Sequence, residues 1–110
     1  MGRWAQARRR GGKPVAGGGP SPPPAPFLQW EVGDLIVTAT GGDDTGGLLR
    51  LYQADLIEGP YYPFDARAWA GSERWDAGSF EPRFWYVATE EGNGVNYAGE
   101  SPQSGPVYAP

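Results

Sequence analysis

The sequence predicts an all-β fold: a small antiparallel β-sandwich, with a small barrel as the alternative, preceded by an extended basic arm. Apolar and polar residues alternate over six or seven short segments that recur at spacings of roughly 8–15 residues. Clusters of Gly, Pro, Asp and Asn separate these segments, as turns require. No stretch of the chain shows the 3.6-residue apolar period of an amphipathic helix.

The predicted arm comprises residues 1–26. It holds half of the twelve prolines and a third of the eighteen glycines of the chain. The prolines at 22–24 favour an extended polyproline path, and the glycines at 17–19 form a loose linker. Such a segment cannot bury enough apolar surface to offset its ordering entropy. We therefore expect the arm to be disordered in the free protein and to become ordered on a partner.

The predicted sandwich domain comprises residues 27–110. Its expected strands, read from alternation and β-branched or aromatic content, lie in FLQWEV (27–32), DLIVTAT (34–40), LLRLYQA (48–54), SERWDAGSFEP (72–82), RFWYVATEE (83–91) and GPVYA (105–109). Pro60 and Pro63 confine any strand between residues 58 and 71 to a sheet edge. The expected core is aromatic because large rings compensate for a short chain; it consists of Trp30, Trp69, Trp75, Phe80, Phe84, Trp85 and Tyr86.

The end of the chain resembles a known family. RFWYVATEE, the following Gly/Asn loop and AGESPQSGPVYAP resemble strand F, the F–G loop and strand G of fibronectin type III domains. FLQWEV, DLIVTAT and LLRLYQA then resemble strands A, B and C. The resemblance implies a fibronectin type III-like or, more broadly, immunoglobulin-like β-sandwich.

The composition argues against catalysis. Cysteine and histidine are both absent, which removes thiolate metal sites, catalytic triads and zinc hydrolase sites. GGDDTGG (41–47) lacks the Lys-Ser/Thr of a phosphate loop and the ligand alternation of a calcium loop. The pairs Glu90–Glu91 and Glu73/Asp76 could act as acid and base, but we favour carboxylates on solvated strand faces. We expect no enzymatic activity, cofactor or metal.

Charge divides the chain into two parts. Residues 1–26 hold five of its nine basic residues and no acidic one, whereas the remainder carries four basic and all thirteen acidic residues. An acidic protein partner suits this arm better than nucleic acid, which the acidic domain would repel. The predicted protein-interface residues are Arg3, Trp4, Arg8, Arg9, Arg10 and Lys13, and the candidate surface aromatic contacts are Tyr61, Tyr62 and Trp69.

The whole arrangement resembles short virion proteins of tailed phages, in particular minor tail proteins. This resemblance implies a structural subunit that is made in the host cytoplasm, resides in the virion and docks through its arm onto tail or capsid subunits in multiple symmetric copies. A weak contact with host-surface glycans is a further expectation, and no membrane partner is expected because no apolar run approaches the ~18 residues of a span. The alternatives are a capsid decoration or minor capsid protein, and a carbohydrate-binding module that uses Trp69, Trp75 or Tyr61.

Overall fold

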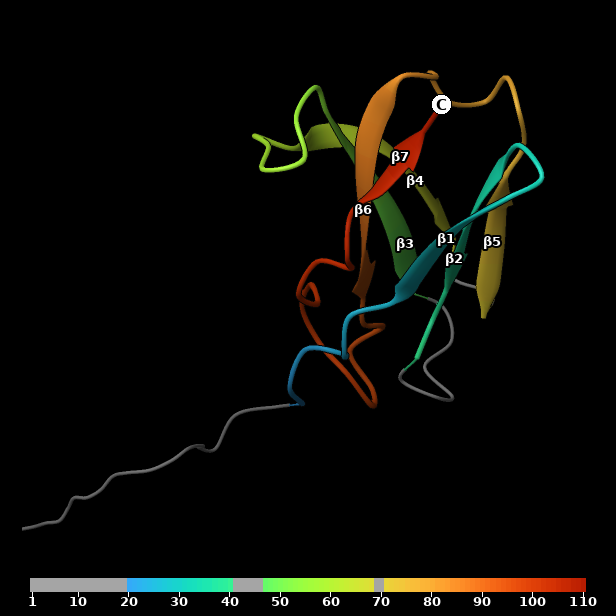
Figure 1. Ribbon diagram of the computed structural model, residues 1–110. Helices are drawn as coiled ribbons and strands as arrows, with labels where there is room; N and C mark the ends of the chain where they lie inside the picture. The colour runs from blue at the N-terminus through green and yellow to red at the C-terminus, as the bar shows by residue number, and fades with distance from the viewer. Residues whose placement is uncertain (1–19, 41–46, 69–70) are drawn as a thin grey trace, which may run out of the picture.

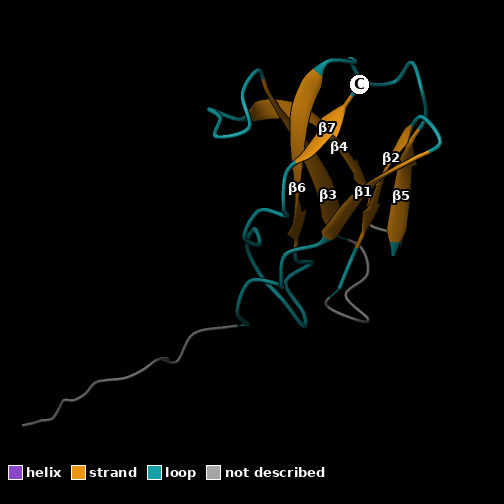
Figure 2. Cartoon of the chain, viewed as in Figure 1, coloured by secondary structure: helices purple, strands orange, loops and turns teal. Residues whose placement is uncertain are grey.

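Two antiparallel β-sheets pack face to face in the computed structural model of the protein (Figures 1 and 2). The structure describes residues 20–40, 47–68 and 71–110, and these contain no helix. One sheet has the strand order β1-β2-β5 and the other β4-β3-β6-β7. The strands are β1 (Phe27–Glu31), β2 (Asp34–Thr38), β3 (Leu48–Ala54), β4 (Tyr62–Ala68), β5 (Ser72–Trp75), β6 (Phe84–Glu91) and β7 (Val107–Ala109).

This arrangement is a fibronectin type III-like sandwich. When the strands are lettered in chain order, A, B and E form the first sheet, and C′, C, F and G form the second. The two sheets have separate edges, so the predicted sandwich is confirmed and the barrel alternative is wrong. The strand that Pro63 confines to an edge is β4, which pairs only with β3 among the described strands.

The inner faces of the two sheets form the hydrophobic core. Leu35 and Val37 of β2 face Leu49 and Leu51 of β3, and all four side chains are fully buried. Period-two alternation places these residues on one face, as the sequence predicts. Among the described residues, the largest fully buried side chain is that of Trp75.

The predicted aromatic core is only partly correct. Trp75, Phe80 and Tyr86 are buried, but Trp30 keeps 36% of its surface exposed. Trp85 precedes the inward-facing Tyr86 in β6, so alternation turns it to the outer face, where it is half-buried against Tyr108 of β7. Phe84 is also half-buried, and Trp69 lies outside the described residues.

Two serines explain the turn-rich stretch that precedes β7. The backbone N–H of Ser101 donates to the carbonyl of Glu90 (2.8 Å), and the Ser101 hydroxyl accepts from the Glu90 N–H (2.9 Å). Ser104 repeats both contacts with the N–H and carbonyl of Ala88, at 2.9 and 2.8 Å. Each hydroxyl thus takes the place of a backbone carbonyl of a neighbouring strand. The backbone groups of β6 at Ala88 and Glu90 therefore have partners, although β7 is too short to reach them.

A tyrosine joins the β5–β6 loop to the core. The buried Tyr86 hydroxyl donates to the carbonyl of Glu81 (2.6 Å) and accepts from the Glu81 N–H (3.0 Å) and from Gln53 Nε2 (3.0 Å). The ring packs edge-on against Phe64 and Phe80. This is the tyrosine corner of immunoglobulin-like sandwiches, in which a tyrosine of strand F bonds back to the preceding loop.

The β1–β2 hairpin has a strained turn. Val32 and Gly33 both have positive φ, 50° and 88°, as in a two-residue type I′ turn. Such turns favour Asn or Asp at the first position because a β-branched side chain fits poorly at positive φ. Val32 is also 93% exposed, so no packing compensates for the strain.

Candidate docking surfaces

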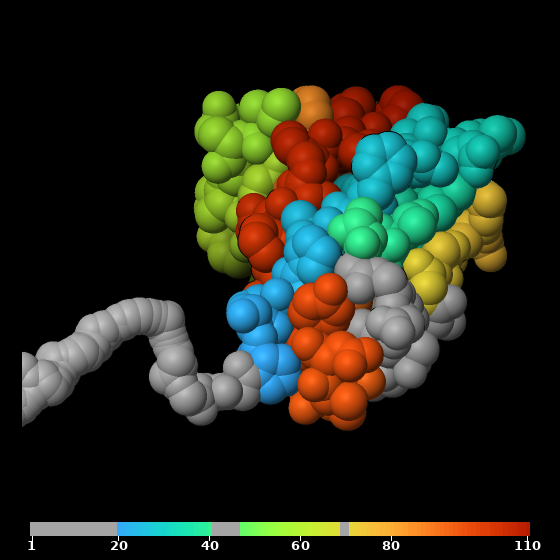
Figure 3. Space-filling model, turned by 90° about the horizontal axis from the view of Figure 1, so that it is seen from below, coloured from blue at the N-terminus to red at the C-terminus, as the bar shows by residue number. Residues whose placement is uncertain are grey.

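The root of the predicted arm is bound to one end of the sandwich. Seen from below, the first described residues lie beside the segment that joins β6 to β7 (Figure 3). The carbonyl of Ser21 accepts from the N–H of Ala98 (2.9 Å), and the carbonyl of Ala25 accepts from the Thr40 hydroxyl (2.8 Å). Pro23 and Pro26 are buried. Contact with the domain thus begins upstream of Phe27, within the stretch that the sequence assigns to the linker.

The six interface residues predicted in the arm, Arg3, Trp4, Arg8, Arg9, Arg10 and Lys13, lie outside the described residues. The structure establishes where the arm is attached. The first described segment, residues 20–26, enters the sandwich at the end opposite the β3–β4 loop (Figure 1). The arm is therefore fixed at the end of the domain that holds the β6–β7 segment.

A small pocket lies at the opposite end, between the β3–β4 loop and the start of β6. Its cavity volume is about 250 Å³. We call it the loop pocket; it is lined by Gln53, Ala54, Asp55, Leu56, Gly59, Pro60, Tyr62 and Phe84. Leu56 and Tyr62 are 59% and 65% exposed, and Ile57 of the same loop is 48% exposed. The pocket is therefore apolar and open to solvent.

The three candidate surface aromatics differ in environment. Tyr62 is exposed and lines the loop pocket, as expected for a contact residue. Tyr61 is half-buried, and its hydroxyl donates to the carbonyl of Ile57 (2.6 Å). Burial raises the pKa of Tyr61, and the nearby Glu58 carboxylate raises it further. Tyr61 thus supports the loop, while Trp69 lies outside the described residues.

Sequence reasoning missed Leu56, Ile57 and Phe84 as contributors to this surface. Leu56 and Ile57 come one residue after the end of β3, and their apolar character resembles the continuation of a strand. The available signal was Gly59-Pro60, which marks a turn just after them. An apolar pair beside a turn has few strand neighbours to cover it, which would have identified it as exposed.

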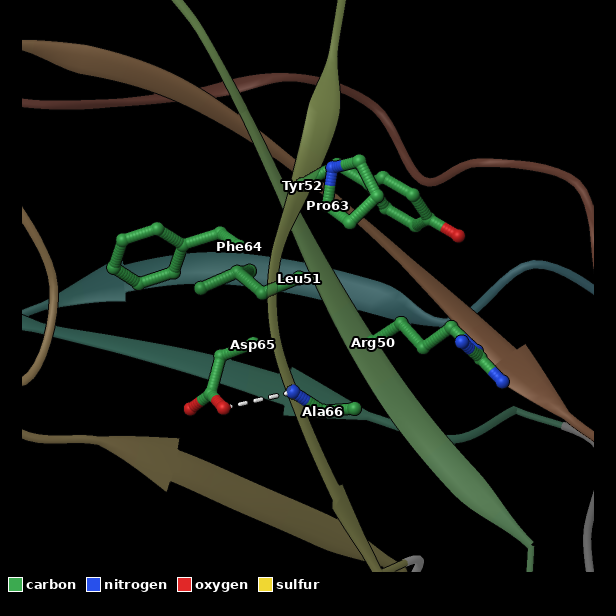
Figure 4. Close-up of a pocket in the computed structure, with 7 residues that line it drawn as sticks. All are labelled: Arg50, Leu51, Tyr52, Pro63, Phe64, Asp65 and Ala66. Atoms are coloured by element: carbon green, nitrogen blue, oxygen red, sulfur yellow. Dashed lines mark hydrogen bonds between the residues drawn. The ribbon is translucent and has the colours of Figure 1, made fainter.

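A second cavity, of about 230 Å³, lies where the register between β3 and β4 shifts at Leu51/Tyr52 (Figure 4). Arg50 and Asp65 are its charged lining residues. Arg50 forms an ion pair with Glu91. Although burial opposes it, hydrogen bonds from Trp75 and Ala66 and the Arg67 guanidinium hold the pKa of Asp65 below its usual range. Asp65 is thus an ionised structural group.

Trp75 joins the two sheets. Because it is buried, its prediction as a glycan contact is wrong. Its indole Nε1 donates to Asp65 Oδ2 of β4 (2.7 Å), and it is fully buried. The Arg67 guanidinium lies 4.4 Å from the centre of the ring and donates to the carbonyl of Arg74 (2.8 Å). The cation–π contact and these hydrogen bonds hold the edge strands β4 and β5 together.

The carboxylates considered as acid and base lie in different environments. The expected solvated position is wrong for Glu90, which pairs with the inward-facing Leu49 and is fully buried. Glu91 lies on the opposite face in an ion pair with Arg50. Glu73 forms an ion pair with Arg67, and no group of three or more potential metal ligands occurs in the described part of the chain. Adjacent strand residues point to opposite faces, so the Glu90–Glu91 pair cannot act on one substrate.

The outer face of the four-stranded sheet carries a polar cluster. Glu100 accepts from the Tyr52 hydroxyl and from the Thr89 hydroxyl (2.5 Å). Despite partial burial, these hydrogen bonds and the nearby Arg50 lower the pKa of Glu100. Burial, and secondarily Glu100, raises the pKa of Tyr52. The Glu100 carboxylate of this cluster is thus already bound by two hydroxyl groups of the same sheet.

Comparisons with known proteins yield a likeness among solved structures. No protein-family model matches the sequence, and no curated protein matches it. Among solved structures, an Fn3-like protein from Clostridium thermocellum matches with a TM-score of 0.49 and 16% identity, over 81% of this chain and 90% of that chain. The fold assignment above depends on the strand order of this chain itself. No helix in the described ranges is long and apolar enough to cross a membrane.

Proposed function

We propose that the protein is a non-enzymatic structural subunit that docks into a larger assembly through its basic N-terminal arm. The observation that carries this proposal is the bound root of the arm, where Ser21 pairs with Ala98 and Pro23 is buried. A fixed root lowers the entropy lost when the rest of the arm binds a partner. Trp4 and the neighbouring arginines are the residue types that dominate binding energy at interfaces.

Three carboxyl groups with lowered pKa values are unsuited to act as a general acid. The pKa values of Asp34, Asp65 and Glu100 are all lowered by hydrogen bonds or nearby arginines, although burial opposes the shift in each case. These groups are anions at neutral pH. A general acid requires a raised pKa, which none of the three has.

We further propose that the assembly is the virion of a tailed phage, with the tail as the location. This rests on the arrangement of the sequence: a basic Gly/Pro-rich arm, one small sandwich and no histidine or cysteine. The partners are then tail subunits, present in multiple symmetric copies. The alternative is a capsid decoration or minor capsid protein, which would bind capsid subunits through the same residues of the arm.

Incorporation of variants into particles tests the proposal. In a phage that encodes the chain, deletion of residues 2–13 should abolish recovery of the protein with gradient-purified particles while the protein stays folded in the lysate. Trp4→Ala should reduce incorporation, because truncation of a buried aromatic anchor costs about 2 kcal/mol or more. Tyr108→Ala, which alters an exposed aromatic residue of β7, is the matched control. Normal incorporation of the deletion variant would contradict docking through the arm.

A further inference from the structure

The β3–β4 loop presents an exposed apolar surface that is already ordered. The side chains of Leu56, Ile57 and Tyr62 are each about half or more exposed. The loop is closed by a hydrogen bond from the Gly59 N–H to the Leu56 carbonyl (2.9 Å) and by that from Tyr61 to Ile57. Gly59 has φ +89°, and an added Cβ would lie 3.1 Å from Tyr61, so this turn depends on glycine. Clustered exposed apolar side chains on a preformed loop are typical of binding surfaces.

The loop pocket is the right size for one large side chain. Its volume of about 250 Å³ is below the range of roughly 300–1,000 Å³ typical of small-molecule sites. Apolar groups from Leu56, Pro60 and Phe84 line it, and Tyr62 forms part of its border. An aromatic side chain with a long apolar body would bury against these groups.

One carboxylate lines this pocket, and two more lie in segments next to its lining residues. Asp55 lines it, Glu58 lies in the same loop, and Glu81 accepts a hydrogen bond from the pocket residue Gln53 (2.7 Å). Within the described ranges, none of these three carboxylates forms a salt bridge. Arg83, which precedes Phe84, is the one nearby basic residue in the sequence. The pocket therefore suits an aromatic residue that is flanked by several cations.

The arm of this chain has that chemistry. Trp4 lies next to Arg3 and is followed by Arg8, Arg9 and Arg10. Fifteen residues lie between Trp4 and Pro20, and the sixteen steps from one to the other span about 53 Å when extended. The seven-residue strand β3 covers only about 23 Å. The arm is therefore long enough to reach the far end of a neighbouring domain.

We infer that the loop pocket binds Trp4 of a second copy of this chain, with the arginines of that arm against Asp55, Glu58 and Glu81. The arm root and the β3–β4 loop lie at opposite ends of the domain (Figure 1), and this loop lines the loop pocket. The contact is therefore head to tail. Heterologous contacts of this kind build rings or filaments. The inference rests on the proposed docking role of the arm, and it adds the site to which the arm binds.

Sedimentation velocity of the full chain at low salt tests this contact. The wild type should associate with rising concentration, and Trp4→Ala and Leu56→Asp should each weaken association at least about thirtyfold, as for a buried anchor. Val32→Asn removes an apolar side chain outside the pocket that is even more exposed than Leu56 and should leave association unchanged. Charge reversal at Asp55 and Glu58 to Arg should prevent association, and reversal of Arg8, Arg9 and Arg10 to Glu should restore it.

Cross-linking separates contact between chains from contact within one chain. A photoreactive benzophenone residue at position 4, in a mixture of ¹⁵N-labelled and unlabelled full chains, should give mixed-isotope cross-links to residues 55–62. Cross-links confined to single chains, or a chain that stays monomeric up to about 1 mM, would overturn the inference. A monomeric chain that still enters particles through its arm would leave the proposed function intact and remove only this receptor.

Discussion

Replacing Tyr86 with phenylalanine should destabilise the domain by removing one hydroxyl. That hydroxyl donates to the Glu81 carbonyl and accepts from the Glu81 N–H and from Gln53 Nε2. Phenylalanine keeps the ring and its edge-on contacts with Phe64 and Phe80. The core therefore gains no cavity, and the change in stability reports the hydrogen bonds alone.

The surroundings of the Tyr86 hydroxyl determine how much stability the Tyr86→Phe variant should lose. Leaving a buried polar group without a partner costs about 1–3 kcal/mol. Glu81 is exposed, so water can partly replace the lost partner, and Gln53 keeps its hydrogen bond to Glu81 Oε1 (2.7 Å). We therefore expect the free energy of unfolding to fall by about 1–2 kcal/mol. For a domain of this size each kcal/mol lowers Tm by roughly 4–8 °C.

Urea denaturation followed by tryptophan fluorescence measures this difference. Tyr108→Phe is the matched control because the Tyr108 side chain is 41% exposed and its hydroxyl bonds to no residue in the described ranges. The control should remain within about 0.5 kcal/mol of the wild type. A Tyr86→Phe variant that is equally close to the wild type would refute the claim that the tyrosine corner stabilises this sandwich.

Three further predictions concern stability. Val32→Asn should raise the free energy of unfolding by about 1 kcal/mol because asparagine tolerates positive φ; an unchanged or lower urea midpoint would contradict the strain at this turn. Ser101→Ala combined with Ser104→Ala should lower it by about 2 kcal/mol, since two strand N–H groups lose their acceptors, and amide exchange should accelerate in β6. The pKa values of Asp65 and Glu100 are lower than their ordinary values of 3.8 and 4.5. The ionised groups contribute their full stabilisation of the fold above these ordinary pKa values. This contribution is lost as the pH falls through the lower pKa values of the folded state. Tm measured from pH ~6 to pH ~2 should therefore fall less steeply for Asp65→Asn than for the wild type.

The strands could be predicted because their signals are local. Alternation at Leu49 and Leu51 fixes the inner face of β3, and Pro63 places β4 at an edge. The faces of adjacent aromatics were harder to predict. Trp85 and Tyr86 have equal apolar character in the sequence, and only the pairing of β6 with β3 and β7 decides which one is buried.

The candidate docking surfaces were less predictable because they depend on contacts between distant segments. Tyr62 could be predicted as a contact residue from its type alone, and that role stays a prediction. The loop pocket also needs Phe84, twenty-two positions further along the chain. Likewise, a proline-rich stretch reads as a linker, yet Pro23 is buried and Ser21 pairs with Ala98. No local pattern could show that the root of the arm packs against the β6–β7 segment.

Quantitative mass spectrometry of density-gradient fractions measures directly whether the protein is a structural component of the virion. If the protein is a structural virion subunit, it should band with infectious tailed particles at a constant ratio to their major structural proteins. The copy number per particle should then be a multiple of the symmetry of the tail or capsid. A protein that stays in the unbanded lysate fraction, or whose ratio to the major structural proteins varies across the particle band, would contradict the account.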